Sequence, residues 1–211
     1  MNAGLVIVKL LNFPIDSNCY IIINKLSGNC IIVDPAQGDG ESLDIYLVVE
    51  KLIPSYIIIT HEHFDHISSV EYIRKKHKCK VVASTRCSES IMNSKKNLSV
   101  FFDQKGFNCG PADLIINRND FEIKWQGEVL RFYLTPGHSE GGICFSMGDN
   151  LFTGDTILRS LRPIVKLPGG NKKALEKSIQ TLLDLFDGQT HIFPGHGETF
   201  KLRDLEVNIN K

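Results

Sequence analysis

The chain has 211 residues, of which 42% are hydrophobic; this is enough for an ordinary globular core and excludes a mainly disordered protein. At this length we expect a single domain over residues 1–211. Its 24 Lys and Arg residues balance 24 Asp and Glu residues, so we expect neither nucleic acid nor a membrane surface as a partner.

The longest apolar runs are far shorter than the ~20 residues that a membrane-spanning helix needs. The first residues lack a basic segment followed by a cleavage motif of small residues, so we expect no signal peptide and a cytoplasmic protein. Six widely spaced cysteines, none in a Cys-x-x-Cys pair, are expected to be buried, reduced thiols.

Short β-strands are predicted in the first third of the chain, where runs of Ile and Val are separated by turn residues. These strands, Leu5–Leu10, Asn18–Ile23 and Asn29–Val33, should form an antiparallel meander. A surface helix over Glu41–Leu52 and a buried strand over Tyr56–Thr60 follow. The pattern then predicts a helix, a strand and a second helix: His66–His77, Cys79–Ser84 and Ser88–Ser94.

The second half of the chain repeats this order, with strands first and a helix last. Its strand candidates are Asp113–Asn117, Phe121–Trp125, Val129–Leu134, Ile143–Met147 and Leu151–Thr153. Asn171–Phe186 has apolar residues on one face and Gly188 after its end, which predicts a helix. This order suggests two sheets packed together with helices outside.

Three of the seven histidines lie within six residues, in the segment THEHFDH at 60–66, directly after the predicted buried strand. Core packing does not explain such a cluster. Residues two apart in an extended segment face the same way, so His61 and His63 can present two imidazoles to one metal ion. A turn into a helix then lets Asp65 and His66 point towards a second position close to the first.

Three further segments carry one His or Asp among glycines, each after a strand candidate: TPGHS at 135–139, TGDT at 153–156 and PGHG at 194–197. Side chains at such positions are held by rigid backbone and stay open to solvent and substrate. The sequence therefore offers seven candidate ligands for two metal ions: His61, His63, Asp65, His66, His138, Asp155 and His196.

These motifs, in this order, resemble the metallo-β-lactamase superfamily and, within it, the glyoxalase II-like hydrolases. The resemblance covers nearly the whole chain and includes Asn18-Cys19-Tyr20, Ile32-Val33-Asp34-Pro35, TPGHSEGG, FTGDTI, LPGG and PGHG. It implies an α+β fold, an αββα sandwich of two mixed sheets packed face to face with helices outside. The metal ions would lie at one edge of the sheets.

The resemblance also implies how the ligands are shared. One metal would take His61, His63 and His138, the other would take Asp65, His66 and His196, and Asp155 would bridge both. The implied cofactor is two Zn²⁺ ions per chain, although Fe or Mn would suit the same ligands. Two such cations make hydroxide available near neutral pH for attack on a small thioester or ester, and Asp65 is the candidate to orient it.

The segment between FTGDTI and LPGG departs from the glyoxalase II-like pattern. Many relatives carry Gly-Arg-x-Asp there, whereas this chain has Pro163, Ile164 and Lys166 and keeps Arg159. Arg159 is a candidate to bind a substrate carboxylate. The expected partner is a small-molecule thioester or ester, and the sequence leaves the oligomeric state open.

Several functions other than the dinuclear hydrolase stay open. An iron-dependent persulfide dioxygenase would use a subset of ligands that matches His61, His138 and Asp155. A lactonase or a non-catalytic binding module on the same scaffold is less favoured. Antibiotic hydrolysis is also disfavoured, because the β-lactamases of the family commonly carry Cys where this chain has Asp155.

Some residues outside the ligand set receive structural interpretations. His77 and His191 have no motif around them and are expected at a surface helix end and in a strand. Phe101 and Phe102 are expected in the core or in a pocket wall. For Glu62, which lies beside the ligands, a role in supporting them is left open.

Overall fold

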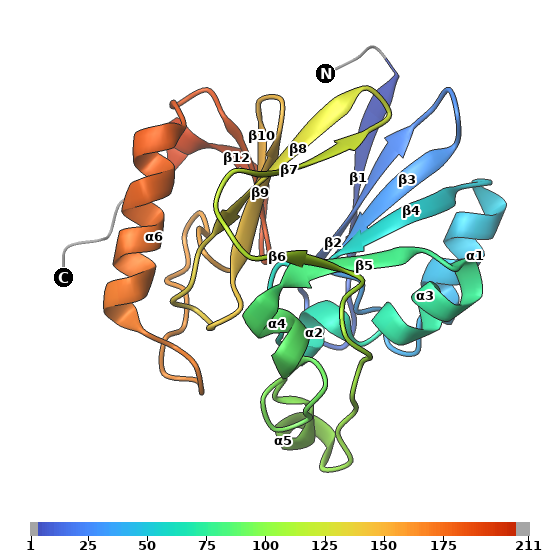
Figure 1. Ribbon diagram of the computed structural model, residues 1–211, viewed down its shortest axis with the longest axis horizontal. Coiled ribbons are helices and arrows are strands. Elements are labelled where there is room, and N and C mark those ends of the chain that lie inside the picture. The colour runs from blue at the N-terminus through green and yellow to red at the C-terminus, as the bar shows by residue number, and fades with distance from the viewer. Residues whose placement is uncertain (1–3, 206–211) are drawn as a thin grey trace.

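Two six-stranded sheets lie face to face in the computed structural model of the chain, which describes residues 4–205 (Figure 1). Helices cover the outer face of each sheet, so the layers follow the order helix, sheet, sheet, helix. Both sheets contain parallel and antiparallel pairs. The predicted αββα sandwich of two mixed sheets is confirmed.

The first sheet is built from the first half of the chain, with its strands in sequence order. They are β1 (Leu5–Leu11), β2 (Asn18–Asn24), β3 (Asn29–Val33), β4 (Ile53–Ile58), β5 (Lys80–Ser84) and β6 (Leu114–Ile116). The first three pair antiparallel, as the meander predicted, and β3 to β6 are parallel. Parallel neighbours need crossover connections, which here carry the helices of the outer layer.

The second sheet is built from the second half of the chain. Its strands are β7 (Phe121–Trp125), β8 (Glu128–Leu134), β9 (Ile143–Met147), β10 (Asn150–Gly154), β11 (His191–Pro194) and β12 (Phe200–Lys201). Helix α6 (Lys172–Leu185) connects β10 to β11, which pair in parallel, and the other neighbours are antiparallel. Asn171 caps this helix, since its side chain accepts a hydrogen bond from the amide of Ala174.

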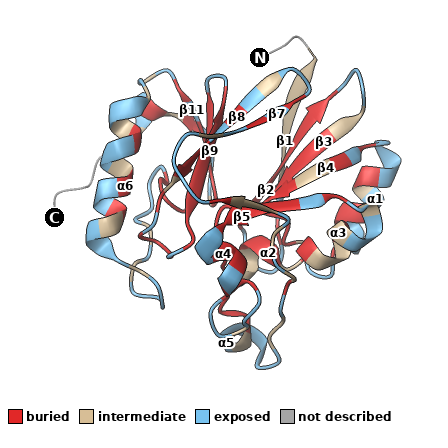
Figure 2. Cartoon of the chain, in the orientation of Figure 1, coloured by how far each residue is buried: buried red, intermediate tan, exposed pale blue. Residues whose placement is uncertain are grey.

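The helices of the first half are α1 (Glu41–Val49), α2 (Phe64–Ile67), α3 (Val70–His77), α4 (Thr85–Ser90) and α5 (Ser99–Asp103). Leu43 and Leu47 of α1 pack with Ile73 of α3 on the outer face of the first sheet. Leu182 of α6 packs in the same way on the outer face of the second sheet. Helices α1, α3 and α6 therefore each bury one apolar face and leave the other side towards solvent (Figure 2).

Aromatic rings fill the space between the sheets. Phe152 stacks on Phe145 at 4.5 Å and on Phe193 at 4.7 Å, and it meets the edge of the Tyr20 ring at 5.6 Å. Successive residues of a strand face opposite sides, so Tyr20 and Ile22 point between the sheets while their neighbours face the helices. This packed interior fixes the positions of the strand ends.

The helix predicted over His66–His77 is broken in the structure, because tertiary contacts interrupt it. Ser69 would donate to the carbonyl of Asp65 in a continuous helix, but its amide donates to the carbonyl of Pro35 at 3.1 Å instead. The Asp65 carbonyl accepts from the Ser17 hydroxyl. Two short helices, α2 and α3, replace the single predicted one.

Two other predictions have clear outcomes. All six cysteines are buried and free, as expected. Phe101 is 70% exposed and Phe102 is 51% exposed, so neither belongs to the core. Both lie on α5, a helix that the sequence did not predict.

Within residues 4–205, none of the helices is long and apolar enough to cross a membrane.

Candidate metal centre

The seven candidate ligands meet at one edge of the sandwich, where five strands end. The segment after β4 carries His61 and His63, and the segments after β8, β10 and β11 carry His138, Asp155 and His196. β3 ends at the same edge with Asp34. Side chains that follow strand ends converge because the strands are held by the packed interior.

The backbone changes direction inside the histidine-rich segment. His63 has an extended conformation, with φ −65° and ψ 144°, and α2 begins at the next residue. His61 and His63 therefore leave the strand in extended backbone, whereas Asp65 and His66 lie on the first helical turn. The predicted division of this segment into two pairs of side chains is present.

His61, His63 and His138 form one group of three imidazoles. One ring nitrogen of each lies within 4.8 Å of the other two. Nε2 of His138 lies 3.0 Å from Nδ1 of His63. All three side chains are buried, so the group has the spacing and shielding of a metal site.

Asp65, His66 and His196 form a second group with the same spacing limit of 4.8 Å. Oδ2 of Asp65 lies 3.7 Å from Nε2 of His66 and 3.4 Å from Nε2 of His196. His66 is fully buried, whereas Asp65 and His196 are partly exposed. This second group lies nearer to solvent than the first.

Asp155 lies between the two groups. Its Oδ2 is 3.4 Å from Nε2 of His138 in the first group and 3.6 Å from Nε2 of His196 in the second. Its Oδ1 is 3.8 Å from Nε2 of His66. A carboxylate with two oxygens placed in this way is suited to bridge two cations.

Several buried polar atoms of this cluster have no hydrogen-bond partner among the described residues: Nε2 of His61, Nε2 of His63, Nε2 of His66 and Oδ1 of Asp155. Unpaired buried polar atoms cost free energy, so a concentration of them needs an explanation. Cations held by the imidazole and carboxylate groups would supply it for His61, His66 and Asp155, whereas His63 faces its group with Nδ1. The donor set of nitrogen and carboxylate oxygen also suits zinc, iron and manganese, so the residues fit a metal centre.

The imidazoles are oriented by contacts on the side away from the centre. Nδ1 of His66 lies 3.0 Å from Oδ2 of Asp34, and Nδ1 of His61 lies 3.1 Å from the Thr60 hydroxyl. The carbonyls of Ile164 and Asp16 play the same part for His138 and His196, at 2.8 and 3.0 Å. An acceptor at Nδ1 holds the proton there and leaves Nε2 available to a metal.

Asp34 is a functional candidate that residue patterns alone missed. Its carboxylate accepts from the Thr60 amide at 2.7 Å and from the Thr60 hydroxyl at 2.6 Å, besides its contact with His66. Asp34 therefore connects the end of β3 to Thr60, the residue before His61, and to His66. The signal available in the sequence was an acidic residue directly after a predicted Ile-rich strand, the same kind of position that the candidate ligands occupy.

The electrostatics of the two groups differ. Burial and neighbouring imidazoles lower the pKa of His61 and bring the pKa of His63 to about 3, and burial also lowers the pKa of His138. Burial acts in the same direction on His66, but Asp65 and Asp34 outweigh it and raise its pKa to about 10. The first group is therefore neutral at pH 7, and His66 carries a proton when no metal is bound.

This difference predicts that metal uptake displaces protons from the imidazoles of one group only. A metal needs neutral imidazole, so cation binding to Asp65, His66 and His196 should displace about one proton or more at pH 7. Binding to His61, His63 and His138 should displace none from the imidazoles. Calorimetric titration of zinc into metal-free protein, in buffers of different ionisation enthalpy, measures this. Identical heats in all buffers would contradict the assignment.

Glycine at 195 is required by the close approach of the backbone to the centre. A Cβ atom there would collide with Oδ1 of Asp155 and would lie 2.9 Å from Cε1 of His66. The glycine before His196 therefore lets the strand end pass directly beside the Asp155 carboxylate.

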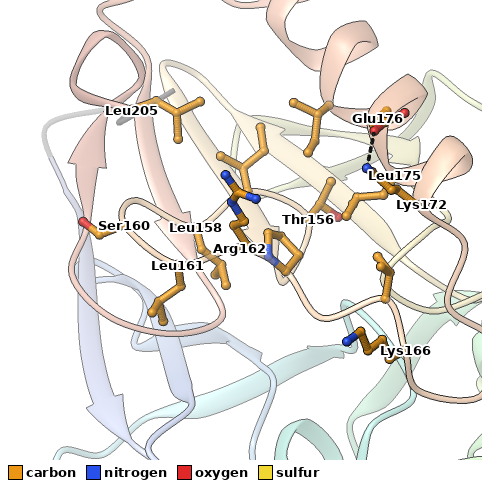
Figure 3. Close-up of a pocket in the computed structure, with 14 residues that line it drawn as sticks. Thr156, Leu158, Ser160, Leu161, Arg162, Lys166, Lys172, Leu175, Glu176 and Leu205 are labelled. Atoms are coloured by element: carbon orange, nitrogen blue, oxygen red, sulfur yellow. Dashed lines mark ion pairs between the residues drawn. The ribbon is translucent and has the colours of Figure 1, made fainter. Parts of the chain in front are cut away.

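The segment after Asp155 is arranged differently from the prediction for Arg159. Arg159 is exposed and is absent from the lining of a cavity of about 650 Å³ between this segment and α6. Arg162 and Lys166 line that cavity with mainly apolar neighbours, and Lys172 and Glu176 of α6 form an ion pair at 3.8 Å beside it (Figure 3). A substrate role for Arg159 stays a prediction.

Three other polar residues have clear positions. Glu62 is buried and accepts from the Ser139 hydroxyl at 3.0 Å, so it links the histidine-rich segment to the residue after His138. His77 ends α3 and contacts Asp44 at 2.8 Å. His191 lies exposed in β11. The structural interpretations of these two histidines agree with their positions.

Two groups of three ligands around one carboxylate define a candidate dinuclear metal centre at the edge of an αββα sandwich. The family model of the metallo-beta-lactamase superfamily matches residues 13–198, and the chain belongs to this superfamily.

Relatives extend over most of the chain. The probable metallo-hydrolase YqgX of Bacillus subtilis is 30% identical over 198 residues, which is 92% of each chain. The probable polyketide biosynthesis zinc-dependent hydrolase BaeB of Bacillus velezensis is 28% identical over 183 residues, 84% of this chain and 72% of that protein.

Solved structures show the same fold. The BLEG-1 B3 metallo-beta-lactamase has a TM-score of 0.87 at 26% identity, covering 94% of this chain and 95% of that one. TTHA1623 in a di-iron-bound form has a TM-score of 0.77 at 25% identity, covering 96% and 98%. These similarities agree with the resemblance of the motifs to the metallo-β-lactamase superfamily.

Proposed function

We propose that the protein is a dinuclear metal hydrolase that cleaves a small thioester or ester, with an activity of the glyoxalase II type. The observation that carries the proposal is the position of the Asp155 carboxylate, 3.4 and 3.6 Å from the imidazoles of two separate ligand groups. A complete ligand set in this geometry favours a working enzyme over a non-catalytic binding module.

Zinc is the proposed metal, with His61, His63 and His138 around one ion and Asp65, His66 and His196 around the other. The relative BaeB is named a zinc-dependent hydrolase, which supports zinc, whereas TTHA1623 was solved in a di-iron-bound form. Ligands of this type accept zinc, iron and manganese, so the metal that the purified protein carries has to be measured.

When bound, the two cations supply hydroxide near neutral pH and stabilise the negative charge that develops on the substrate carbonyl oxygen. Asp65 is suited to orient the attacking water. Burial favours the protonated form of Asp65, but His66 and His196 outweigh this and lower its pKa below the usual range. Asp65 is therefore ionised at neutral pH and can accept a hydrogen bond from water as well as bind metal.

A thioester makes few further demands on the protein. A thiolate leaving group has a pKa near ~8.5, so it departs without a strong general acid. Glu62 is the buried carboxyl next to the ligands, and its hydrogen bond to Ser139 gives it a supporting position rather than a catalytic one. Arg159 is proposed to bind a substrate carboxylate, as the sequence predicted.

The test is thiol release from S-lactoylglutathione by protein reconstituted with zinc. We expect turnover by the wild-type protein and its loss after removal of metal with a chelator, with recovery when zinc is restored. A chromogenic cephalosporin should be assayed beside it, because one solved relative is named a B3 metallo-beta-lactamase.

Other outcomes would select the alternatives. Oxygen consumption with a glutathione persulfide by the iron-loaded protein, without thioester cleavage, would indicate a persulfide dioxygenase. Failure to bind metal stoichiometrically would indicate a non-catalytic module. Cleavage of a lactone but of no thioester would restrict the proposal to esters.

A further inference from the structure

A small aromatic cavity lies next to the candidate metal centre, on the side of the Asp65 group. Its volume is about 210 Å³, and Asp65 itself is one of its lining residues. The walls include four phenylalanines and a second carboxylate: Phe13, Phe64, Phe102, Phe107 and Asp103. Asp65 therefore belongs both to the candidate metal centre and to the wall of this cavity.

Phe13 and Phe102 leave an unusual amount of aromatic surface in solvent, since their side chains are 74% and 51% exposed. The Phe102 ring stacks on Phe64 with ring centroids 4.8 Å apart. Exposed apolar groups gathered around a cavity are typical of a binding site, because burial against a ligand would remove them from water.

The wall that carries Phe13 is hydrogen-bonded to the segment after β3. The Asn12 side chain donates to the carbonyl of Asp34 at 3.0 Å and accepts from the amide of Ala36, also at 3.0 Å. The amide of Gly38 donates to the carbonyl of Phe13 at 3.3 Å. These contacts fix the β1–β2 connection to the segment that supports His66.

The opposite wall is α5, and it is also held in place. The amide of Phe107 donates to the Ser99 hydroxyl at 2.8 Å, and the Asn97 side chain donates to the Phe107 carbonyl at 2.8 Å. Only one of the two neighbouring phenylalanines of α5 faces the cavity. Phe102 lines it, whereas Phe101 is more exposed and does not.

The charge of the cavity restricts what it can hold. Asp65 and Asp103 are its charged residues, and none of the described residues that line it is Lys, Arg or His. An anionic group would find no cationic side chain among these residues and would meet the Asp103 carboxylate, whereas a neutral apolar group would contact the phenylalanine rings. The volume of about 210 Å³ is below the ~300–1,000 Å³ of pockets that enclose a whole ligand, so it suits one part of a substrate.

We propose that this cavity receives an uncharged, apolar acyl group of the substrate, of the size of a phenyl ring or a branched alkyl chain, and that Phe102 selects for it. The inference rests on the proposed hydrolase function, because the acyl carbon must lie at the metal centre. It makes Phe102 a specificity-determining residue.

The test compares two thioesters of N-acetylcysteamine, which share a neutral leaving group and differ in an acetyl or a phenylacetyl group. The wild-type protein should have the higher kcat/KM for the phenylacetyl thioester. Phe102→Ala should lower the ratio of the two kcat/KM values by about two- to tenfold, the range for loss of one aromatic contact. Phe101→Ala is the matched control and should leave the ratio unchanged.

A binding measurement separates this inference from the hydrolase proposal. The neutral ketone 4-phenylbutan-2-one should bind the wild-type protein and Phe101→Ala in ligand-observed NMR, and should bind Phe102→Ala about two- to tenfold more weakly. Ketone binding that depends on Phe102 without thioester cleavage would support the cavity and refute the hydrolase. An equal ratio of the two kcat/KM values in Phe102→Ala and Phe101→Ala would overturn the inference. Ketone binding of equal strength in these two variants would overturn it as well.

Discussion

Asp155→Ala should lose bound metal and should lower thioesterase activity by about a hundredfold or more. Asp155 contacts imidazoles of both ligand groups, so its removal weakens both metal positions at once. Changes of residues that merely support metal ligands already cost ~10–100-fold, and a bridging ligand should cost at least as much. Elemental analysis of zinc and the thiol-release assay measure the two effects.

The matched control is Asp149→Ala, which removes an exposed carboxylate in the turn before β10. It should keep both metal and activity. The fold of the Asp155 variant should survive, because the site lies at the sheet edge and the interior between the sheets is untouched. A circular dichroism spectrum like that of the wild-type protein checks this, and an Asp155 variant with full metal and full activity would refute the bridging role.

Asp34→Asn should reduce metal affinity by about ten- to a hundredfold, although Asp34 contacts no substrate or metal in the proposal. Oδ2 of Asp34 accepts from the Thr60 hydroxyl and lies 3.0 Å from Nδ1 of His66. An amide nitrogen in that place would face Nδ1 with a hydrogen-bond donor. His66 would then hold its proton on Nε2, the atom that points to the centre.

Asparagine suits the backbone at this position, since Asp34 has a φ of 52° and Asn tolerates the left-handed region. The effect should therefore come from the hydrogen bonds rather than from strain. Asp44→Asn is the matched control because Asp44 forms a similar contact with His77, 2.8 Å away, outside the centre. Equal zinc affinity for the two variants, measured by competition with a chelating dye, would contradict the role of Asp34.

The ligand segments could be predicted from the sequence because their chemistry is local. The spacing of His61 and His63 fixes which way both imidazoles face in extended backbone, and the glycine-flanked His138, Asp155 and His196 follow strand ends. The strands themselves carry a strong signal in their Ile and Val content. Their packing into two sheets then brings the strand ends to one edge.

Other features could not be predicted because they depend on contacts between distant segments. The break between α2 and α3 arises because the Ser69 amide donates to the carbonyl of Pro35 and the Asp65 carbonyl accepts from the Ser17 hydroxyl. The contact between Asp34 and His66 joins residues from different elements, and periodicity contains no information about it. Helix α5 is a short turn whose position depends on Phe107 and Asn97.

The two sheets come from separate halves of the chain, and the ligands are divided between them. The first half supplies His61, His63, Asp65 and His66, and the second supplies His138, Asp155 and His196. Each proposed metal ion would therefore be a crosslink between the halves, as well as a catalyst. Metal loading should raise the resistance of the whole sandwich to unfolding, since ligands that bind only the folded state stabilise it. Activity and fold stability would then depend on the same supply of metal.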